Sequence, residues 1–189
     1  MAPVTSVFIA LNLKDSVKRE LLLVKERFPE LPARWVSLDN LHITLAFLGN
    51  RSQKEIAHTA NVLQKIGEEQ KPIDISFSEI SYGPPQGPPC MVWALLEPNA
   101  LLNSLQKEIV QDLAKANLYK QEKSTFSPHV TLARLKELQF QNIEQEEQPN
   151  VSEPLSLACK ISSMEIMESR QGRGVMKYTE IESIPFLKT

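Results

Sequence analysis

Alternating apolar and polar residues predict strands along much of this chain, and apolar residues at helical spacing predict helices between them. Ile73, Ile75 and Phe77 alternate with polar neighbours, which is typical of a strand with one buried face. Leu105 and Ile109 belong to a series at helical spacing and indicate the buried face of a helix. The predicted strands are residues 4–13, 41–48, 72–82, 90–96, 129–133, 155–168 and 175–184, with a short extended piece at residues 34–36, and the predicted helices are residues 15–28, 52–69 and 99–118.

These elements form two similar halves: strand–helix–strand–helix–strand, then a loop, then strand–helix–strand–strand–strand. The turn-rich segment 83–89 between them is either a domain linker or a loop joining two antiparallel strands. The loop is favoured because a strand follows it directly. Segment 138–150 is rich in Gln and Glu, which predicts an exposed, mobile loop. The chain is therefore predicted to be one domain, residues 1–189, with two lobes.

Composition and charge narrow the classes of function. A formal net charge of -2 argues against broad binding of polyanions, although it leaves room for a small basic pocket that holds one phosphate. Cys90 and Cys159 lack a metal-binding spacing, which favours free thiols in a reducing cytosol. The N-terminus has no signal-peptide pattern, and no apolar run reaches the ~18 residues that a membrane span needs. We expect a cytoplasmic monomer without membrane contact.

Two of the three histidines begin the same tetrapeptide, His-aliphatic-Thr-Leu. His42 opens the first copy and His129 the second, 129 − 42 = 87 residues later. Both copies lie in β-prone surroundings, where side chains alternate between the two faces of a strand. His42 and Thr44 therefore share one face, as do His129 and Thr131, with aliphatic residues behind them. One copy alone would be interpreted as a structural histidine on a strand, but the matched pair predicts two motif strands that share one cleft.

The chemistry of this set favours a phosphate. Two imidazoles near neutral pH form an acid–base pair, in which one takes a proton while the other gives one. Hydroxyls beside them can hydrogen-bond the non-bridging oxygens of a phosphate as negative charge grows there. This set fits in-line displacement at phosphorus and requires neither a metal nor another cofactor. A zinc site would lack its usual third ligand in both motifs, and His58 lies in a helical pattern that predicts a surface position.

Arg134 follows the second motif and could hold a phosphate or stack on a base. Strict alternation, however, places it on the face opposite His129. Arg134 joins the site only if the strand ends or bulges near Ala133, and is otherwise a surface charge.

These residues resemble the two-histidine (2H) phosphoesterase superfamily, whose signature is a pair of His-x-Thr/Ser-x motifs. The closer similarity is to its RNA 2′,3′-cyclic phosphodiesterase family, also known as the 2′-5′ RNA ligase family. Residues 34–36 and 41–49 resemble the first block of that family, and residues 126–134 resemble the second. Residues 7–10 fit an outer strand. One departure is Ser6, where many members have arginine.

The resemblance implies an α+β, bilobal 2H phosphoesterase fold, with two antiparallel sheets facing each other across a central cleft and helices on the outside. It implies metal-independent hydrolysis of a terminal 2′,3′-cyclic phosphate to a 2′-phosphate. By analogy, His42 is the proton donor to the leaving 3′ oxygen, and His129 is the proton acceptor that activates water. Thr44 and Thr131 then hold the phosphate, and Arg134 binds the substrate. The residues alone do not separate acid from base, because the motifs have nearly symmetric surroundings.

The expected partners are RNA ends or nucleotides with a 2′,3′-cyclic phosphate, and not DNA, because the cyclic ester requires a 2′-hydroxyl. Some relatives run the reverse reaction and form a 2′-5′ link, so ligation stays open. Two alternatives remain: a non-catalytic module that holds a nucleotide in the same cleft, and a 2H relative that acts on another phosphodiester. A bell-shaped pH–rate curve would favour the acid–base pair, since one histidine must be neutral and the other charged.

Overall fold

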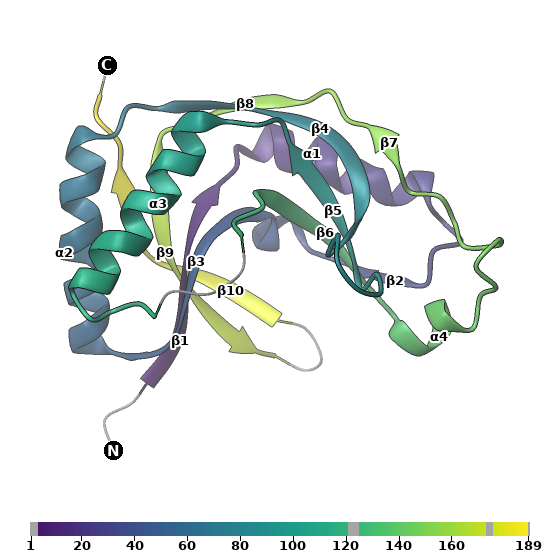
Figure 1. The fold of residues 1–189 in the computed structure, drawn as a ribbon, viewed down its shortest axis with the longest axis horizontal. Coiled ribbons are helices and arrows are strands. Elements are labelled where there is room, and N and C mark those ends of the chain that lie inside the picture. Colours follow the sequence, from purple (N-terminus) through teal and green to yellow (C-terminus); the bar gives the residue numbers. More distant parts are fainter. Residues whose placement is uncertain (1–3, 121–124, 173–175, 189) are drawn as a thin grey trace.

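Strands make up the centre of the molecule, and the longer helices lie outside them (Figure 1). The computed structural model describes residues 4–120, 125–172 and 176–188. The strands are β1 (Val4–Asn12), β2 (Ala33–Trp35), β3 (His42–Ser52), β4 (Ile73–Gly83), β5 (Met91–Leu96), β6 (His129–Leu135), β7 (Glu153–Pro154), β8 (Ala158–Ile161), β9 (Ser163–Gln171) and β10 (Met176–Pro185). The helices are α1 (Asp15–Leu23), α2 (Gln53–Glu69), α3 (Ala100–Lys115) and α4 (Glu137–Gln141), with the 3-10 helices η1 (Val24–Arg27) and η2 (Leu38–Asn40).

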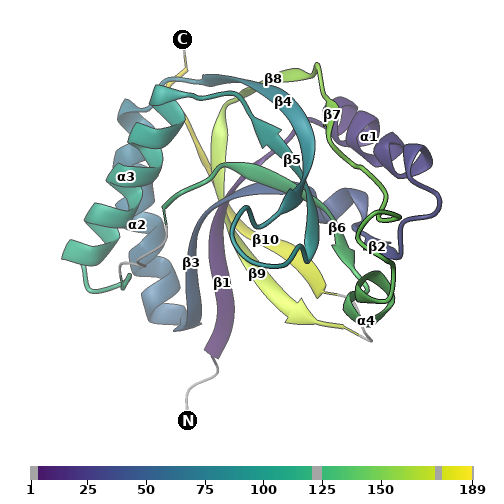
Figure 2. The same cartoon turned by 45° about the vertical axis from the view of Figure 1, so that its right-hand side comes forward.

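The strands are antiparallel and follow the order β10-β9-β1-β3-β6-β5-β4-β7, with β2 paired to β6 and β8 paired to β4. The two motif strands, β3 and β6, meet at the centre of this path through a single residue pair, Ile43 with Val130. Two groups of strands are therefore joined at one pair, and Figures 1 and 2 show them running at different inclinations. This arrangement agrees with the expected two lobes and adds a central connection that the residue pattern did not predict.

Helix α2 shows how local sequence sets an element boundary. The Ser52 hydroxyl accepts a hydrogen bond from the Glu55 N–H (3.4 Å), and the Glu55 carboxylate accepts one from the Ser52 N–H (2.8 Å). This reciprocal capping satisfies two backbone groups that a helix start otherwise leaves unpaired, an effect typically of about 1 kcal/mol. The predicted start of this helix at residue 52 is confirmed within one position.

The hydrophobic core continues from one half of the molecule into the other. It includes Ile9 from β1, Ile43 from β3, Val130 from β6 and Val92 from β5, each fully buried. Helices α2 and α3 lie side by side against one end of the sheet, and α1 lies on the side of β7 in both views (Figures 1 and 2). None of the helices in the described ranges is both long and apolar enough to cross a membrane.

The expectation of an exposed loop over residues 138–150 is wrong in its first part. Helix α4 forms there, and its Phe140 is only 3% exposed. Phe140 packs edge-on against Tyr82 with ring centroids 5.4 Å apart, and the Tyr82 hydroxyl donates a hydrogen bond to the Pro149 carbonyl (2.6 Å). One aromatic residue thus anchors a segment whose composition is otherwise polar.

The predicted strand over residues 155–168 is two strands. Residues of β8 pair with β4 in one half, whereas residues of β9 pair with β1 in the other half. The chain therefore passes from one half to the other at Ser162, between β8 and β9. A single alternating pattern in the sequence covers both strands and does not reveal this change of partner.

Candidate active site

Strands β3 and β6 carry the two motifs at the centre of the sheet path, where the halves meet. His42 and Thr44 are half-buried on β3, and Ile43 between them is fully buried. His129 and Thr131 are likewise half-buried on β6. The predicted alternation of polar and buried faces is confirmed in both strands.

Strand β3 departs from regular pairing directly after its motif. Thr44 pairs with Ala10 of β1, but the next pair is Ala46 with Ile9. Leu45 is therefore an extra residue, which makes a β-bulge. Leu45 and Ala46 are both buried, so alternation shifts by one position, and Phe47 returns to the face of the histidine.

Strand β6 repeats this bulge at the equivalent position. Thr131 pairs with Trp93 of β5, but the next pair is Ala133 with Val92, which leaves Leu132 as the extra residue. Arg134 consequently points to the same face as Thr131. Arg134 was predicted to join the site only if the strand ended or bulged near Ala133, and this bulge is present.

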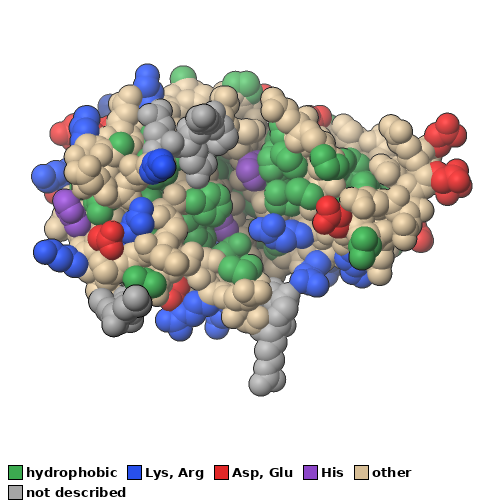
Figure 3. All heavy atoms as spheres, turned by 60° about the horizontal axis from the view of Figure 1, so that its bottom comes forward, with side chains coloured by type: hydrophobic (Ala, Val, Ile, Leu, Met, Phe, Trp, Pro, Cys, Tyr) green, Lys and Arg blue, Asp and Glu red, His purple; other side chains and the backbone are tan. Residues whose placement is uncertain are grey.

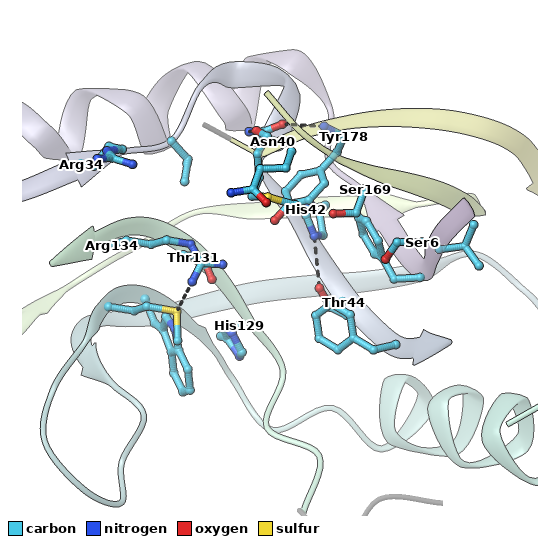
Figure 4. A pocket seen from close by; sticks show the side chains of 18 of the residues that line it. Ser6, Arg34, Asn40, His42, Thr44, His129, Thr131, Arg134, Ser169 and Tyr178 are labelled. Atoms are coloured by element: carbon cyan, nitrogen blue, oxygen red, sulfur yellow. Dashed lines mark hydrogen bonds between the residues drawn. The ribbon is translucent and has the colours of Figure 1, made fainter. Parts of the chain in front are cut away.

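One cavity of about 780 Å³ lies between the motif strands (Figures 3 and 4). Figure 3 shows the hollow with histidine side chains inside it, and Figure 4 shows His42 and His129 on different strands facing the same space. The structure thus brings together all of the predicted site residues. The predicted residues in its lining are His42, Thr44, His129, Thr131 and Arg134.

His42 lies deep in the cavity, enclosed by aromatic rings. Its centroid is 4.9 Å from that of Phe8 and 5.1 Å from that of Tyr178, which meets it edge-on. Its Nε2 shares a hydrogen bond of 3.1 Å with the Thr44 hydroxyl. Burial lowers the pKa of His42 to about 4, a shift that the nearby Asn40 backbone opposes. This backbone contact is not a full hydrogen bond, because the buried Nδ1 has no partner among the described residues.

His129 is held by two contacts outside its motif. Its Nδ1 lies 2.8 Å from the Ser127 carbonyl oxygen. Because a carbonyl only accepts, Nδ1 is the donor, and a neutral ring keeps its lone pair on Nε2. One face of the His129 ring stacks on Trp93, with centroids 3.7 Å apart and an interplanar angle of 16°. Burial lowers the pKa of His129, and the contact with Ser127 opposes that shift.

Two positively charged neighbours also act on His42. The ammonium of Lys18 contributes to lowering the pKa of His42, and positive charge on His129 contributes less. The shared cavity makes the two rings parts of one site, as the matched motifs predicted.

A model of the 2′-5′ RNA ligase superfamily matches residues 18–173 of the chain. The chain belongs to this superfamily. Among its relatives, the RNA 2′,3′-cyclic phosphodiesterase of Aquifex aeolicus is 27% identical over 126 residues, which cover 66% of this chain and 64% of that protein. The RNA 2′,3′-cyclic phosphodiesterase of Archaeoglobus fulgidus is 28% identical over 131 residues, which cover 69% of this chain and 72% of that protein.

Solved structures confirm the fold of this superfamily member. LigT of Escherichia coli, complexed with 3′-AMP, superposes with a TM-score of 0.79 at 20% identity, covering 98% of this chain and 100% of that one. A protein of Thermus thermophilus superposes with a TM-score of 0.80 at 22% identity, covering 96% of this chain and 97% of that one. The bilobal α+β fold expected from the resemblance is confirmed.

The site of this 2′-5′ RNA ligase superfamily member includes residues that the motif pattern missed. These residues come from other strands. The alternating pattern predicts which face of a strand a residue lies on, but it does not predict which strands are neighbours. Asn40 shows the difficulty: its side chain donates to the Met176 carbonyl (2.8 Å) and accepts from the Tyr178 N–H (3.3 Å), which ties β10 to the wall beside His42. The additional lining residues include Phe8, Arg34, Phe47, Met91, Trp93 and Tyr178.

The arrangement can hold a phosphate group between two imidazoles and two hydroxyls. One imidazole can take a proton while the other gives one, and the hydroxyls can donate to charged oxygens. Across the described ranges, no group of three or more His, Cys, Asp or Glu residues has a metal-binding arrangement. His58 lies exposed on α2, outside the cavity, as its helical pattern predicted.

Proposed function

We propose that this chain is an RNA 2′,3′-cyclic phosphodiesterase that hydrolyses a terminal 2′,3′-cyclic phosphate to a 2′-phosphate, with residues 1–189 acting as one bilobal domain. The observation that carries the proposal is that two His-x-Thr motifs, from different halves of the chain, line one cavity. The names of the relatives in the same superfamily support the choice of substrate. A 2′-hydroxyl is required to form the cyclic ester, so the substrate is RNA or a ribonucleotide.

In the proposed reaction, Nε2 of His129 takes a proton from water, and the water oxygen attacks phosphorus. The Thr44 and Thr131 hydroxyls donate hydrogen bonds to the non-bridging oxygens as charge grows there. The bond from phosphorus to the 3′ oxygen breaks, and His42 gives that oxygen its proton. Arg134 supports the substrate through its guanidinium. His129 suits the accepting role because its Nδ1–H is committed to the Ser127 carbonyl (2.8 Å).

The donor role of His42 depends on the substrate. With a pKa of about 4, the ring is neutral at pH 7 and lacks the acidic proton that an imidazolium would donate. A phosphodiester anion beside the ring favours its charged form and raises that pKa. His42 therefore becomes a competent donor only when the substrate occupies the cavity.

The direct test is a product assay on a nucleoside 2′,3′-cyclic phosphate, with chromatography that separates the 2′- and 3′-monophosphates. We expect the 2′-phosphate, at a rate that a chelator such as EDTA leaves unchanged, because the two histidines supply both proton transfers. A 3′-phosphate product would reverse the assignment of the leaving oxygen. No turnover of any cyclic substrate, despite tight binding of a monophosphate, would favour the non-catalytic module instead.

Ligation is the second candidate, because the superfamily is described by that activity. Joining a cyclic phosphate end to a 5′-hydroxyl end uses the same groups in the same roles, because the 5′-hydroxyl takes the place of water: His129 takes its proton, its oxygen bonds to phosphorus, and His42 gives a proton to the departing 3′ oxygen. Incubating the two RNA ends together, and analysing the linkage formed, separates ligation from hydrolysis.

Trp93→Leu is expected to lower kcat by roughly 10-fold, because His129 loses the ring that fixes its orientation. Trp93 is 6% exposed and covers one face of His129, so its removal lets water reach the imidazole. The lowered pKa of His129 then rises toward 6.5, and the acidic limb of the kcat/KM profile moves to higher pH. Trp93→Phe retains a stacking ring and should restore most of both properties. An unshifted acidic limb in Trp93→Leu would contradict this positioning role.

A further inference from the structure

Asn40, the last residue of the 3-10 helix η2, binds the outer edge of strand β10 beside the cavity. Its side-chain N–H donates to the Met176 carbonyl oxygen (2.8 Å), and its side-chain oxygen accepts from the Tyr178 N–H (3.3 Å) (Figure 4). Strand β10 ends the strand path, so no other described strand pairs with this edge. An edge strand otherwise leaves such backbone groups unpaired. The Asn40 side chain therefore takes the place of a peptide group from a neighbouring strand.

His42 and Tyr178 together separate two cavities. The large cavity contains the motif residues, and a smaller one of about 180 Å³ lies behind His42. His42 and Tyr178 are the two residues that line both cavities. Their rings meet edge-on with centroids 5.1 Å apart, and Phe8 packs against both rings. The burial of His42 therefore depends on where β10 holds Tyr178.

The smaller cavity is suited to water rather than to an apolar side chain. Its charged lining residues are Lys18 of α1, Asp39 of η2, Glu165 of β9 and Glu180 of β10. Because a water molecule occupies about 30 Å³ and needs polar partners, several can fit there. A displaced Tyr178 ring would open this space to His42, and hydration favours the charged form of an imidazole. The other ionisable group that faces His42 is His129, across the large cavity.

We propose that Asn40 is a positioning residue for the proton donor: its two hydrogen bonds hold β10 so that Tyr178 covers the ring of His42 and separates it from the smaller cavity. Asn40 also lies two residues before His42 in the chain, so one residue connects this wall to the strand that carries the donor. Its amide is committed to β10, and it acts through His42. The inference rests on the proposed function for the donor role of His42, and deepens it.

The first measurement requires no variant. Amide hydrogen exchange of the wild-type protein should show a protected Tyr178 N–H, although this group lies on the outer edge of the sheet. Exchange of this amide as fast as that of an unpaired group would overturn the proposal. This result decides the question even if substitution of Asn40 prevents folding.

Asn40→Ala removes both hydrogen bonds and keeps the backbone of η2. We expect the NMR titration of the His42 ring in the unliganded protein to move from about 4 toward its ordinary value of 6.5, because water reaches the ring. His58 and His129 report in the same spectra and should titrate close to their wild-type values, since His58 is exposed on α2 and His129 stacks on β5. On a cyclic nucleotide, kcat should fall by about 10-fold with a smaller change in KM, because the donor loses its orientation.

Asn99→Ala is the matched control. The Asn99 side chain makes the same pair of bonds at the start of α3, donating to the Asp74 carbonyl (2.8 Å) and accepting from the Leu102 N–H (3.0 Å), outside both cavities. This variant should keep the wild-type kcat and His42 titration. An unmoved His42 titration in folded Asn40→Ala, or an equal movement in Asn99→Ala, would overturn the positioning role. Neither NMR nor hydrogen exchange requires turnover, so wild-type protein inactive on every cyclic substrate would overturn the proposed function separately.

Discussion

Replacing either histidine of the motifs with alanine is expected to lower kcat by about 10³-fold or more on a nucleoside 2′,3′-cyclic phosphate. General acid or base catalysis by one positioned side chain typically contributes about 10²–10⁴-fold. His42→Ala removes the proton donor, and His129→Ala removes the group that activates water. The measurement is single-turnover and steady-state product formation at several pH values.

The matched control for this loss is the third histidine. His58 is exposed on α2 and lies outside the cavity, so His58→Ala should retain wild-type kcat. Thermal unfolding of each variant shows whether lost activity reflects lost structure. The double variant His42→Ala/His129→Ala should be little slower than the slower single variant, because groups that act together are not additive. Full activity in either single variant would contradict the acid–base pair.

The motif pair was predictable because alternation is a local property of a strand. His42 and Thr44 share a face by their spacing alone, and so do His129 and Thr131. The sequence also contains a signal for the bulge that follows each motif, although strict alternation does not take it into account. Each motif continues as Leu-Ala, two adjacent apolar residues, and in both strands these are the buried residues at the bulge. Position 134 could therefore have been assigned to the histidine face from that repeated break in pattern.

The surroundings of the histidines were not predictable in the same way, because they depend on which strands are neighbours. Trp93 reaches His129 from β5, whereas Phe8 and Tyr178 reach His42 from β1 and β10. The position opposite Thr44 on β1 is the small Ala10, but the position opposite Thr131 on β5 is Trp93. The two motifs look symmetric in sequence, but their histidine rings have different neighbours in the cavity. This difference supports different roles for the two imidazoles.

Acid pH is expected to destabilise the wild-type protein more than His42→Gln, by about 3 kcal/mol in the free energy of unfolding at pH 4 relative to pH 8. Burial lowers the pKa of His42 from 6.5 to about 4 in the folded state. Between those values the unfolded chain binds the proton and the folded chain does not, so stability falls as pH falls through this window. Above 6.5 both states are neutral at this position, and the contribution is complete. Urea unfolding of both proteins across this range measures the difference.

Comparison with the variant is necessary because other ionisable side chains lie near His42. A smaller cavity of about 180 Å³ behind the ring includes Lys18 from α1, Glu165 from β9 and Glu180 from β10. Burial raises the pKa of Glu165, so its contribution changes with pH in the opposite direction. These groups remain in His42→Gln, and subtracting the two curves isolates the imidazole. Parallel curves for the two proteins would show that His42 is not held neutral.

The same burial determines how the proposed donor obtains its proton. A bound phosphodiester anion compensates the charge of an imidazolium, so saturating ligand should remove much of the acid sensitivity of the wild-type protein. It should not change that of His42→Gln, which cannot take up a proton at this position. Ligand binding to the wild type near pH 6 should therefore be accompanied by proton uptake, measurable by calorimetry in buffers of different ionisation enthalpy. A ring kept neutral in the empty cavity and charged in the occupied one couples the proton to the substrate that needs it.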